Sequence, residues 1–178
     1  MQAAEEIEKL RYPAGRFEFG KHYTFENTKR SIDRLKDFPQ SLEDFFRNFK
    51  KENLNKTYRD GGWTALQLFN HLVDVYINAY MRTKWLLAEQ DAILKPYNEN
   101  ECAKLADSKY KNVEDSIMLI KFLFDRWLFL LESLPQETFN KTIYHPEYKV
   151  TISLHELVAM YEWHGYHHLA HLKIINGN

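Results

Sequence analysis

The sequence has few turn-forming residues, with 6 glycines and 5 prolines among 178 residues. This scarcity favours long helices over many short strands, which argues against an all-β architecture. The single cysteine, Cys102, excludes an intramolecular disulfide framework and suits a reducing compartment. The start, MQAAEEIEKL, lacks the basic and apolar regions of a signal peptide, and no apolar run reaches the length of a membrane span. We therefore expect a soluble cytoplasmic protein.

The sequence also lacks an excess of either charge, because 24 Lys and Arg are balanced by 25 Asp and Glu. Nucleic acids and anionic membranes attract strongly basic surfaces. The balance therefore predicts a small-molecule substrate and neither a nucleic-acid nor a membrane partner. Hydrophobic residues make up 44% of the chain, and folding at this length buries roughly 70% of the extended surface. A metal is not needed to hold such a fold together, so a metal site would serve function.

Hydrophobic periodicity predicts a single all-α domain over residues 1–178, without internal repeats or linkers. Residues 1–26 are expected to form an N-terminal arm that is irregular through RYPAGRFEFG. Pro39 is expected to kink or split the first long helix, because proline removes a backbone donor. Apolar residues at helical spacing predict four long helices, over about 27–51, 64–89, 113–134 and 153–175.

Two helix starts carry a capping-box pattern, in which side chains satisfy the free amides of the first turn. Thr64 with Gln67 gives T-x-x-Q, and Ser153 with Glu156 gives S-x-x-E. Between the helices, residues 90–112 form a long connection with room for one short helix, and loops of this length are often functional. The run TIYHPEYKVTI predicts a small hairpin or extended segment before the last helix. The overall prediction is a four-helix bundle.

The second helix carries a polar line as well as its core stripe. At about 100° per residue, five side chains fall within a band roughly 80° wide. Such a polar band is equally expected for a helix face exposed to solvent and for a face that carries a functional site. The five residues are Gln67, His71, Asp74, Asn78 and Arg82.

The last helix carries most of the histidines, four of them within WHGYHHLAH. His164 and His168 fall on the inward stripe of this helix, within about 60° of Tyr161. Two imidazoles four residues apart are close enough to share one metal ion. His167 and His171 have the same spacing but lie at the edge of the stripe, so we favour the first pair. Without a metal, buried histidines would need hydrogen-bond partners.

A third ligand for a catalytic zinc or nickel site has to come from another helix, because such sites usually keep three protein ligands and one open position. His71 is the natural candidate, since it lies on the polar line of the second helix. His22 and His145 are expected in loops, and His155 is expected to point away from the stripe.

A general base is harder to assign. No glutamate lies between His164 and His168, which rejects the H-E-x-x-H metalloproteases. Asp74 shares the face of His71 and is either a base, a carboxylate that orients an imidazole, or an exposed helix residue. Glu162 is a weaker candidate, because it points about 100° away from the centre of the stripe.

Several blocks of the sequence resemble the YfiT-like metal-dependent hydrolases, a branch of the DinB-like four-helix bundle superfamily. They are YPAGRFE, GGWTALQLFNHLVD, NAYMRTKW, KPY, RW, HPE and WHGYHHLAH, in the expected order over about residues 10–175. The resemblance implies one divalent ion, zinc or nickel, on His71, His164 and His168, and a homodimer. It also implies either hydrolase activity or transfer of the low-molecular-weight thiol bacillithiol to electrophiles.

Three hypotheses follow. In a hydrolase, the ion would lower the pKa of bound water toward ~7 and Asp74 would assist as base. In a thiol S-transferase, the ion would bind a small thiol as thiolate, and Asn78 with Arg82 would hold a carboxylate of that cofactor. A salt bridge is the alternative role for Arg82. The third hypothesis is a non-catalytic, metal-binding stress-response bundle, which is distinguished by whether the imidazoles face a cavity or a filled core.

Three aromatic residues near these motifs have open roles. Trp63 and Trp163 flank histidine-bearing segments and either line a pocket or pack at helix ends. Tyr97, in the KPY block, is either a hydrogen-bond donor to the site or an anchor for its loop. Cys102 is expected to be a small buried hydrophobic residue and not a nucleophile.

Overall fold

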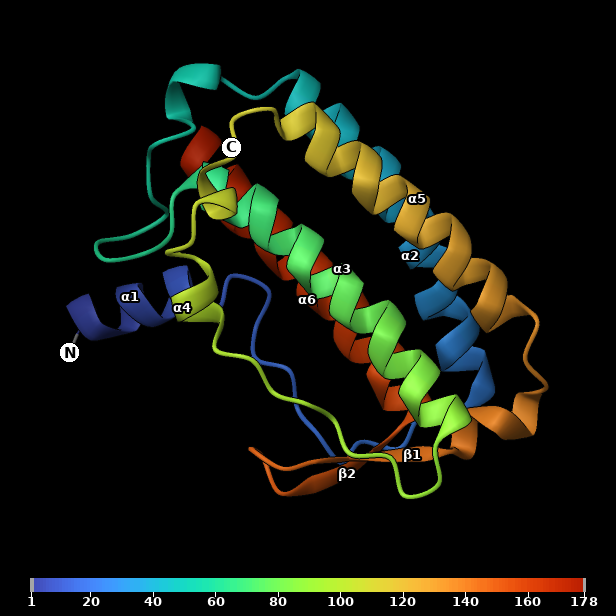
Figure 1. Ribbon diagram of the computed structural model, residues 1–178. Coiled ribbons are helices and arrows are strands. Elements are labelled where there is room, and N and C mark those ends of the chain that lie inside the picture. The colour runs from blue at the N-terminus through green and yellow to red at the C-terminus, as the bar shows by residue number, and fades with distance from the viewer. Residues whose placement is uncertain (1, 178) are drawn as a thin grey trace.

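Four long helices form a bundle, as the sequence predicts (Figure 1). The computed structural model describes the backbone of residues 2–177 and the side chains of residues 5–177. Helix α3 packs against α5 and α6, and α2 packs against the same two helices, so each long helix contacts two others. The long helices are α2 (Phe25–Arg47), α3 (Ala65–Ala88), α5 (Val113–Glu132) and α6 (Leu154–Asn176).

Large apolar side chains from all four helices fill the interior. Trp127 and Phe38 are almost fully buried, and so are Tyr76 and Tyr161. The indole N–H of Trp127 donates to Oγ1 of Thr83 at 2.9 Å, so this buried polar atom is satisfied. The core therefore fixes how the bundle helices sit against one another.

The capping boxes that the sequence predicts are present at both helix starts. Oγ1 of Thr64 accepts from the backbone of Gln67, whose side chain accepts from the Thr64 backbone. Ser153 and Glu156 make the same reciprocal bonds at the start of α6. These caps fix the beginnings of the two helices that carry His71 and the histidine cluster.

Two parts of the fold differ from the prediction. Residues Gln2–Arg11 form a further helix, α1, in the segment that we expected to be an arm. This segment has too few large apolar residues to show a core stripe in the sequence. Helix α2 continues through Pro39, where a break was expected. Pro39 and its neighbours Leu35 and Phe38 are buried, and this packing outweighs the lost hydrogen bond.

The connection after α3 runs back along one side of the bundle toward the start of α3 (Figure 1). The segment after α3 contains the short helix α4 (Glu99–Cys102) and a 3-10 turn at Asp107–Lys109, which confirms the predicted long connection. The predicted hairpin is also present, as strands β1 (Thr142–His145) and β2 (Val150–Ser153) in antiparallel pairing. Ile93 pairs with Tyr144, which ties the long connection to the hairpin. Two further 3-10 turns lie at Lys51–Asn53 and Gln136–Asn140.

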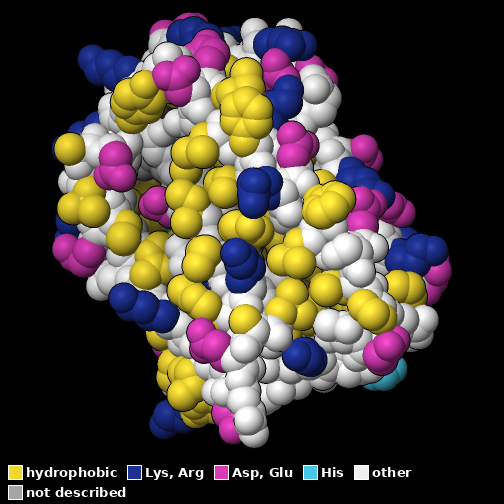
Figure 2. Space-filling view, turned by 45° about the vertical axis from the view of Figure 1, so that its right-hand side comes forward, with side chains coloured by type: hydrophobic (Ala, Val, Ile, Leu, Met, Phe, Trp, Pro, Cys, Tyr) yellow, Lys and Arg dark blue, Asp and Glu magenta, His cyan; other side chains and the backbone are white. Residues whose placement is uncertain are grey.

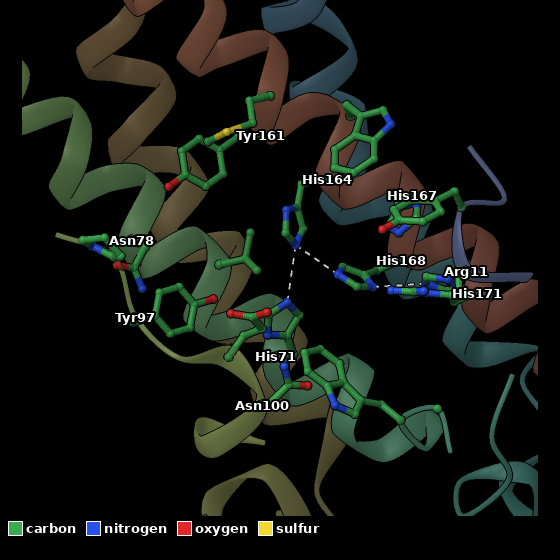
Figure 3. A pocket seen from close by; sticks show the side chains of 18 of the residues that line it. Arg11, His71, Asn78, Tyr97, Asn100, Tyr161, His164, His167, His168 and His171 are labelled. Carbon is green, nitrogen blue, oxygen red and sulfur yellow. Dashed lines mark hydrogen bonds between the residues drawn. The ribbon is translucent and has the colours of Figure 1, made fainter. Parts of the chain in front are cut away.

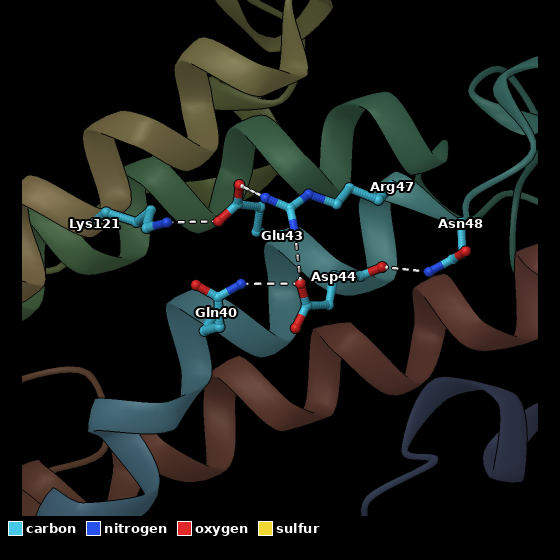
Figure 4. A network of polar contacts seen from close by, with 6 residues as sticks. All are labelled: Gln40, Glu43, Asp44, Arg47, Asn48 and Lys121. Carbon is cyan, nitrogen blue, oxygen red and sulfur yellow. Dashed lines mark hydrogen bonds and ion pairs between the residues drawn. The ribbon is translucent and has the colours of Figure 1, made fainter.

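A polar network links α2 to α5 on the surface (Figure 4). Nζ of Lys121 lies 2.5 Å from Oε2 of Glu43, and Arg47 bridges Glu43 and Asp44 from the same helix. These groups are partly or largely exposed, and such pairs contribute at most about 1 kcal/mol each. The network supports the packing of the two helices without determining it.

The outer face of α5 is apolar. Figure 2 shows hydrophobic side chains gathered on the face that is turned forward there, with a few Lys and Arg among them. Met118, Phe122 and Phe129 are spaced four and seven residues apart, so they share one side of the helix. Phe122 is 60% exposed and Phe129 is 77% exposed. Within residues 2–177, no helix has the length and hydropathy that crossing a membrane requires.

Candidate metal centre

Helices α3 and α6 bring three histidines together at their contact, as Figure 3 shows. Nε2 of His164 lies 3.3 Å from Nε2 of His71 and 3.0 Å from Nε2 of His168. His164 and His168 are one turn apart on α6, and His71 faces them from α3. The three ring nitrogens therefore converge on one point. We call these residues the histidine trio.

The trio fits a divalent metal ion. All three ligand atoms lie within 4.8 Å of one another. Two nitrogens on one tetrahedral ion, each at about 2.0–2.1 Å, lie about 3.3–3.4 Å apart, close to the two observed separations. His71 and His168 are buried, whereas His164 is partly exposed to a cavity of about 390 Å³. This geometry leaves an open side on which a further ligand could bind.

The trio is also uncharged at neutral pH. Burial lowers the pKa of His71 to about 3. Burial, with the neighbouring His71 and Arg82, lowers the pKa of His164 to about 3, and burial also holds the pKa of His168 well below its usual value. A neutral imidazole keeps the lone pair that binds a metal, so no proton has to be displaced near pH 7.

The other predicted site residues of α3 are divided between the cavity and its surroundings. Asn78 and Arg82 line the cavity, but Asp74 is not among the residues that line it. Asp74 is half-buried, and burial together with the charge of Asp107 raises the pKa of Asp74. Glu162 binds Arg34 at 2.6 Å in a separate groove. The carboxylates that do line the cavity are Glu99 and Glu147.

Two hydrogen bonds hold Arg82 in place, and no acidic side chain among the described residues forms a salt bridge with it. It is 7% exposed, and it donates through Nη1 to the Tyr161 hydroxyl and through Nη2 to the Lys95 carbonyl, both at 2.9 Å. Its Nε is buried with no hydrogen-bond partner. An ionised guanidinium with an unused donor at a cavity wall suits an anionic group of a ligand.

Three aromatic residues whose roles were open all line the cavity: Trp63, Trp163 and Tyr97. The ring of Trp63 lies 4.6 Å from that of His71, edge to face, and 6.2 Å from that of His168. This indole packs against one side of the trio. Burial raises the pKa of Tyr97, so the phenol keeps its proton and can donate a hydrogen bond.

Three of the remaining histidines do not join the trio. His155 was expected to point away from the inward stripe, but it is buried because the start of α2 covers that part of α6. Its Nδ1 lies 2.5 Å from Oγ1 of Thr28. His22 is exposed. His145, on β1, lines the cavity without joining the trio, so the hairpin contributes to the site.

Sequence reasoning missed the parts of the cavity wall that come from the N-terminal segment and from the turn before α3. Arg11 and Tyr12 come from the N-terminal segment, and Tyr58 and Arg59 come from the turn before α3. The only signals for them were the YPAGRFE block and the YRDGG turn, which have no periodicity to show where their side chains point.

Comparisons with known proteins show the family to which the chain belongs. A sequence model of the DinB superfamily matches residues 34–172. A protein of Geobacillus thermodenitrificans (strain NG80-2), named "Putative metal-dependent hydrolase", is 39% identical over 166 residues. The match covers 93% of this chain and 93% of that protein. A protein of Bacillus cereus (strain 03BB102) with the same name is 39% identical over 163 residues, covering 92% of this chain and 93% of the relative.

Two solved structures have a similar fold. YfiT from Bacillus subtilis, described as a probable metal-dependent hydrolase with an unusual four-helix bundle topology, superposes with a TM-score of 0.89 at 34% identity. That match covers 94% of this chain and 95% of YfiT. A mycothiol-dependent maleylpyruvate isomerase superposes with a TM-score of 0.64 at 13% identity, over 85% of this chain and 63% of the isomerase, which is a likeness of fold alone.

Proposed function

The chain belongs to the DinB superfamily, together with YfiT and relatives that are named as metal-dependent hydrolases, and from this membership we propose that it is a metal-dependent hydrolase of small molecules. The observation that carries the proposal is the convergence of three neutral imidazoles at the wall of a cavity. Their nitrogens suit zinc, with nickel as the alternative. Because the trio faces a cavity, a substrate could reach the ion, which supports an enzyme over a non-catalytic, metal-binding stress-response bundle.

The chain's own residues divide the work at this site. His71, His164 and His168 would hold the ion. When bound, the ion supplies Lewis-acid chemistry, polarising a carbonyl and favouring the deprotonated form of a water molecule or thiol. Arg82 and Asn78 line the cavity and orient an anionic substrate group, and Trp63 packs against the trio. Of the acidic residues, Glu99 and Glu147 line the cavity and can accept a proton there, whereas Asp74 lies off it.

The direct test is ester hydrolysis by the full chain loaded with zinc. We expect p-nitrophenyl esters to be hydrolysed by the zinc-loaded protein, with activity lost after dialysis against a chelator and restored by zinc. Arg82→Met should raise KM for an ester that carries a free carboxylate by about 10–150-fold and leave a neutral ester little changed, since one charge-assisted hydrogen bond contributes about 1.5–3 kcal/mol. A loaded protein that hydrolyses no ester or amide would refute the hydrolase.

A thiol S-transferase is the second candidate, and the cationic wall of the cavity favours it. Arg11, Arg59 and Arg82 all line the cavity, and such groups would bind the carboxylates of a low-molecular-weight thiol. Cys102 is not among the lining residues, so the thiol would come from a bound cofactor. The assay is consumption of bacillithiol with monobromobimane, in which a sulfur–carbon bond forms and bromide leaves. Metal-dependent consumption without ester hydrolysis would favour the transferase.

We also propose that the apolar face of α5 is where a second copy of the chain docks. Met118, Phe122 and Phe129 expose this face, and no other described part of the chain covers it. Phe122→Glu should convert a dimer into a monomer, because a charge in an apolar interface is costly to bury. Light scattering after size exclusion measures the mass. Ile7→Glu, on the exposed face of α1, is the matched control, and an unchanged mass for Phe122→Glu would refute this interface.

A further inference from the structure

Helix α6 presents histidines on two of its faces. His164 and His168 face α3 and form the trio. Trp163, His167 and His171, spaced four residues apart, instead contact the N-terminal segment. Nε1 of Trp163 donates to the Gly15 carbonyl at 3.2 Å, and the ring of His167 lies 6.1 Å from that of Tyr12. The second face therefore holds the N-terminal segment against the metal centre.

His171 connects the two faces. Its Nε2 lies 3.0 Å from the backbone carbonyl oxygen of Leu10, in α1, and its Nδ1 lies 3.3 Å from Nδ1 of His168. Figure 3 shows this contact continuing the line of dashed bonds from His71 through His164 and His168. His171 is only 2% exposed, so water does not compete for these contacts.

The donors along this line can be assigned from what each atom is able to do. A carbonyl oxygen only accepts, so Nε2 of His171 carries the proton and donates to Leu10. Nδ1 of a neutral His171 is then a bare acceptor, which makes Nδ1 of His168 the donor between the two rings. Nε2 of His168 is left with its lone pair free, and this is the atom that faces His164 and His71.

We propose that His171 is a positioning residue that fixes His168 in its metal-binding tautomer, and that the Leu10 carbonyl makes helix α1 part of the metal centre. The proposal rests on the proposed function, because it assigns His168 as a ligand. Ligand histidines usually donate their second ring N–H to an orienting acceptor, and losing that acceptor typically weakens metal binding 10–100-fold. Here the acceptor is another imidazole, which is itself oriented by the backbone of a distant helix.

Further contacts hold α1 and His171 in place. The ring of Tyr58, from the turn before α3, lies 3.9 Å from that of His171 and fixes its plane. Arg16 pairs with Glu8 through both Nε and Nη2, which folds the chain after α1 back against the helix. These contacts give His171 one orientation, so the direction of its Nδ1 lone pair is defined by the fold.

His167, His168 and His171 also lie close enough to hold an ion of their own. Nδ1 of His167 is buried with no partner, which fits that arrangement. However, both ring nitrogens of His171 already have partners, and a neutral His168 would have to lose its one N–H proton to bind two ions. The geometry therefore favours the orienting role of His171, and a second ion is the result that would overturn it.

Zinc affinity, measured by competition with a chromophoric chelator, tests the proposal. His171→Phe fills the same space without an acceptor and should bind zinc 10–100-fold more weakly. His171→Asn places its Oδ1 near the position of Nδ1 and should stay within about threefold of the wild type, because it keeps an acceptor for His168. His155→Ala removes a buried histidine of α6 that contacts Thr28, so this control should bind one zinc ion with unchanged affinity. His167→Phe keeps a ring against Tyr12 and reports whether a second ion is bound. An unchanged His171→Phe, an equally weak His171→Asn, or a second ion that His167→Phe removes would overturn the proposal.

The tautomers can be read directly, without any metal, from the ¹⁵N shifts of the imidazoles in the full chain. We expect protonated Nδ1 on His168 and protonated Nε2 on His171, with the His168 preference lost in His171→Phe. Protonated Nε2 on His168 in the wild type would overturn the proposal. If the wild type binds no zinc at all, the proposed function fails, and the tautomer measurement still decides the role of His171.

Removing residues 1–10 tests the part played by α1. The truncated chain should bind zinc as weakly as His171→Phe, and the two changes together should be no worse than either alone, because both break the same line of hydrogen bonds. Additive losses would show that α1 acts on the site by another route and would overturn its assignment to the metal centre.

Discussion

The protein with His168→Ala is expected to hold no metal. The two remaining imidazoles, His71 and His164, give an ion only two protein ligands, whereas zinc sites usually need at least three. Metal content, measured by mass spectrometry after growth in zinc, should fall from about one ion per chain to less than about 0.1 ion per chain. His71→Ala should have the same effect from the other helix.

The matched control is His155→Ala, which removes another buried histidine from the same helix. His155 contacts Thr28 and lies away from the cavity, so this variant should keep its ion. Circular dichroism of both variants checks that the helices remain. A wild type that binds neither zinc nor nickel under metal-replete conditions would return the trio to the status of buried core histidines.

The second large effect is expected at Gly165, between two ligands of the trio. In an exposed helix, replacing glycine with alanine stabilises by up to about 1 kcal/mol. Here an added Cβ would clash with the hydroxyl of Tyr76 and lie 3.0 Å from the ring of Phe38. Because the core cannot give way, we expect Gly165→Ala to lower the free energy of unfolding by about 1–3 kcal/mol or more, as measured by urea denaturation.

Tyr76 offers the control for this prediction. Its hydroxyl is buried and has no hydrogen-bond partner, so Tyr76→Phe should be neutral or stabilising. In the Tyr76→Phe background, Gly165→Ala should cost at least about 1 kcal/mol less than in the wild type, because the nearest atom is gone. Equal costs in the two backgrounds would place the strain elsewhere, for example at Phe38.

The four long helices and their starts could be predicted because their signals are local. Core residues repeat at helical spacing, and capping pairs such as Thr64 with Gln67 lie three residues apart in the sequence. The convergence of His164 and His168 was visible for the same reason, since both lie on one helix. Placing His71 beside this pair required the assumption that its helix is a neighbour of the last helix. The structure shows that α3 does pack on α6.

The remaining features depend on contacts between distant segments. The continuity of α2 through Pro39 comes from burial against other helices, which local rules do not include. Helix α1 has too few apolar residues to show a stripe, and it is held by contacts such as that of Leu10 with His171. The partners of Arg82 lie on α6 and in the loop after α3, so its burial without a salt bridge could not be read from its own helix.

The trio lies on two long, packed helices, whereas much of the surrounding wall comes from connecting segments, including Tyr12, Tyr58 and Glu99. Side chains on packed helices hold their positions, whereas connecting segments tolerate substitution and changes of length. The two parts of the site can therefore evolve separately. A protein that kept these three ligands could acquire a different substrate by exchanging its loops, so the metal centre proposed here would indicate the type of chemistry better than the molecule transformed.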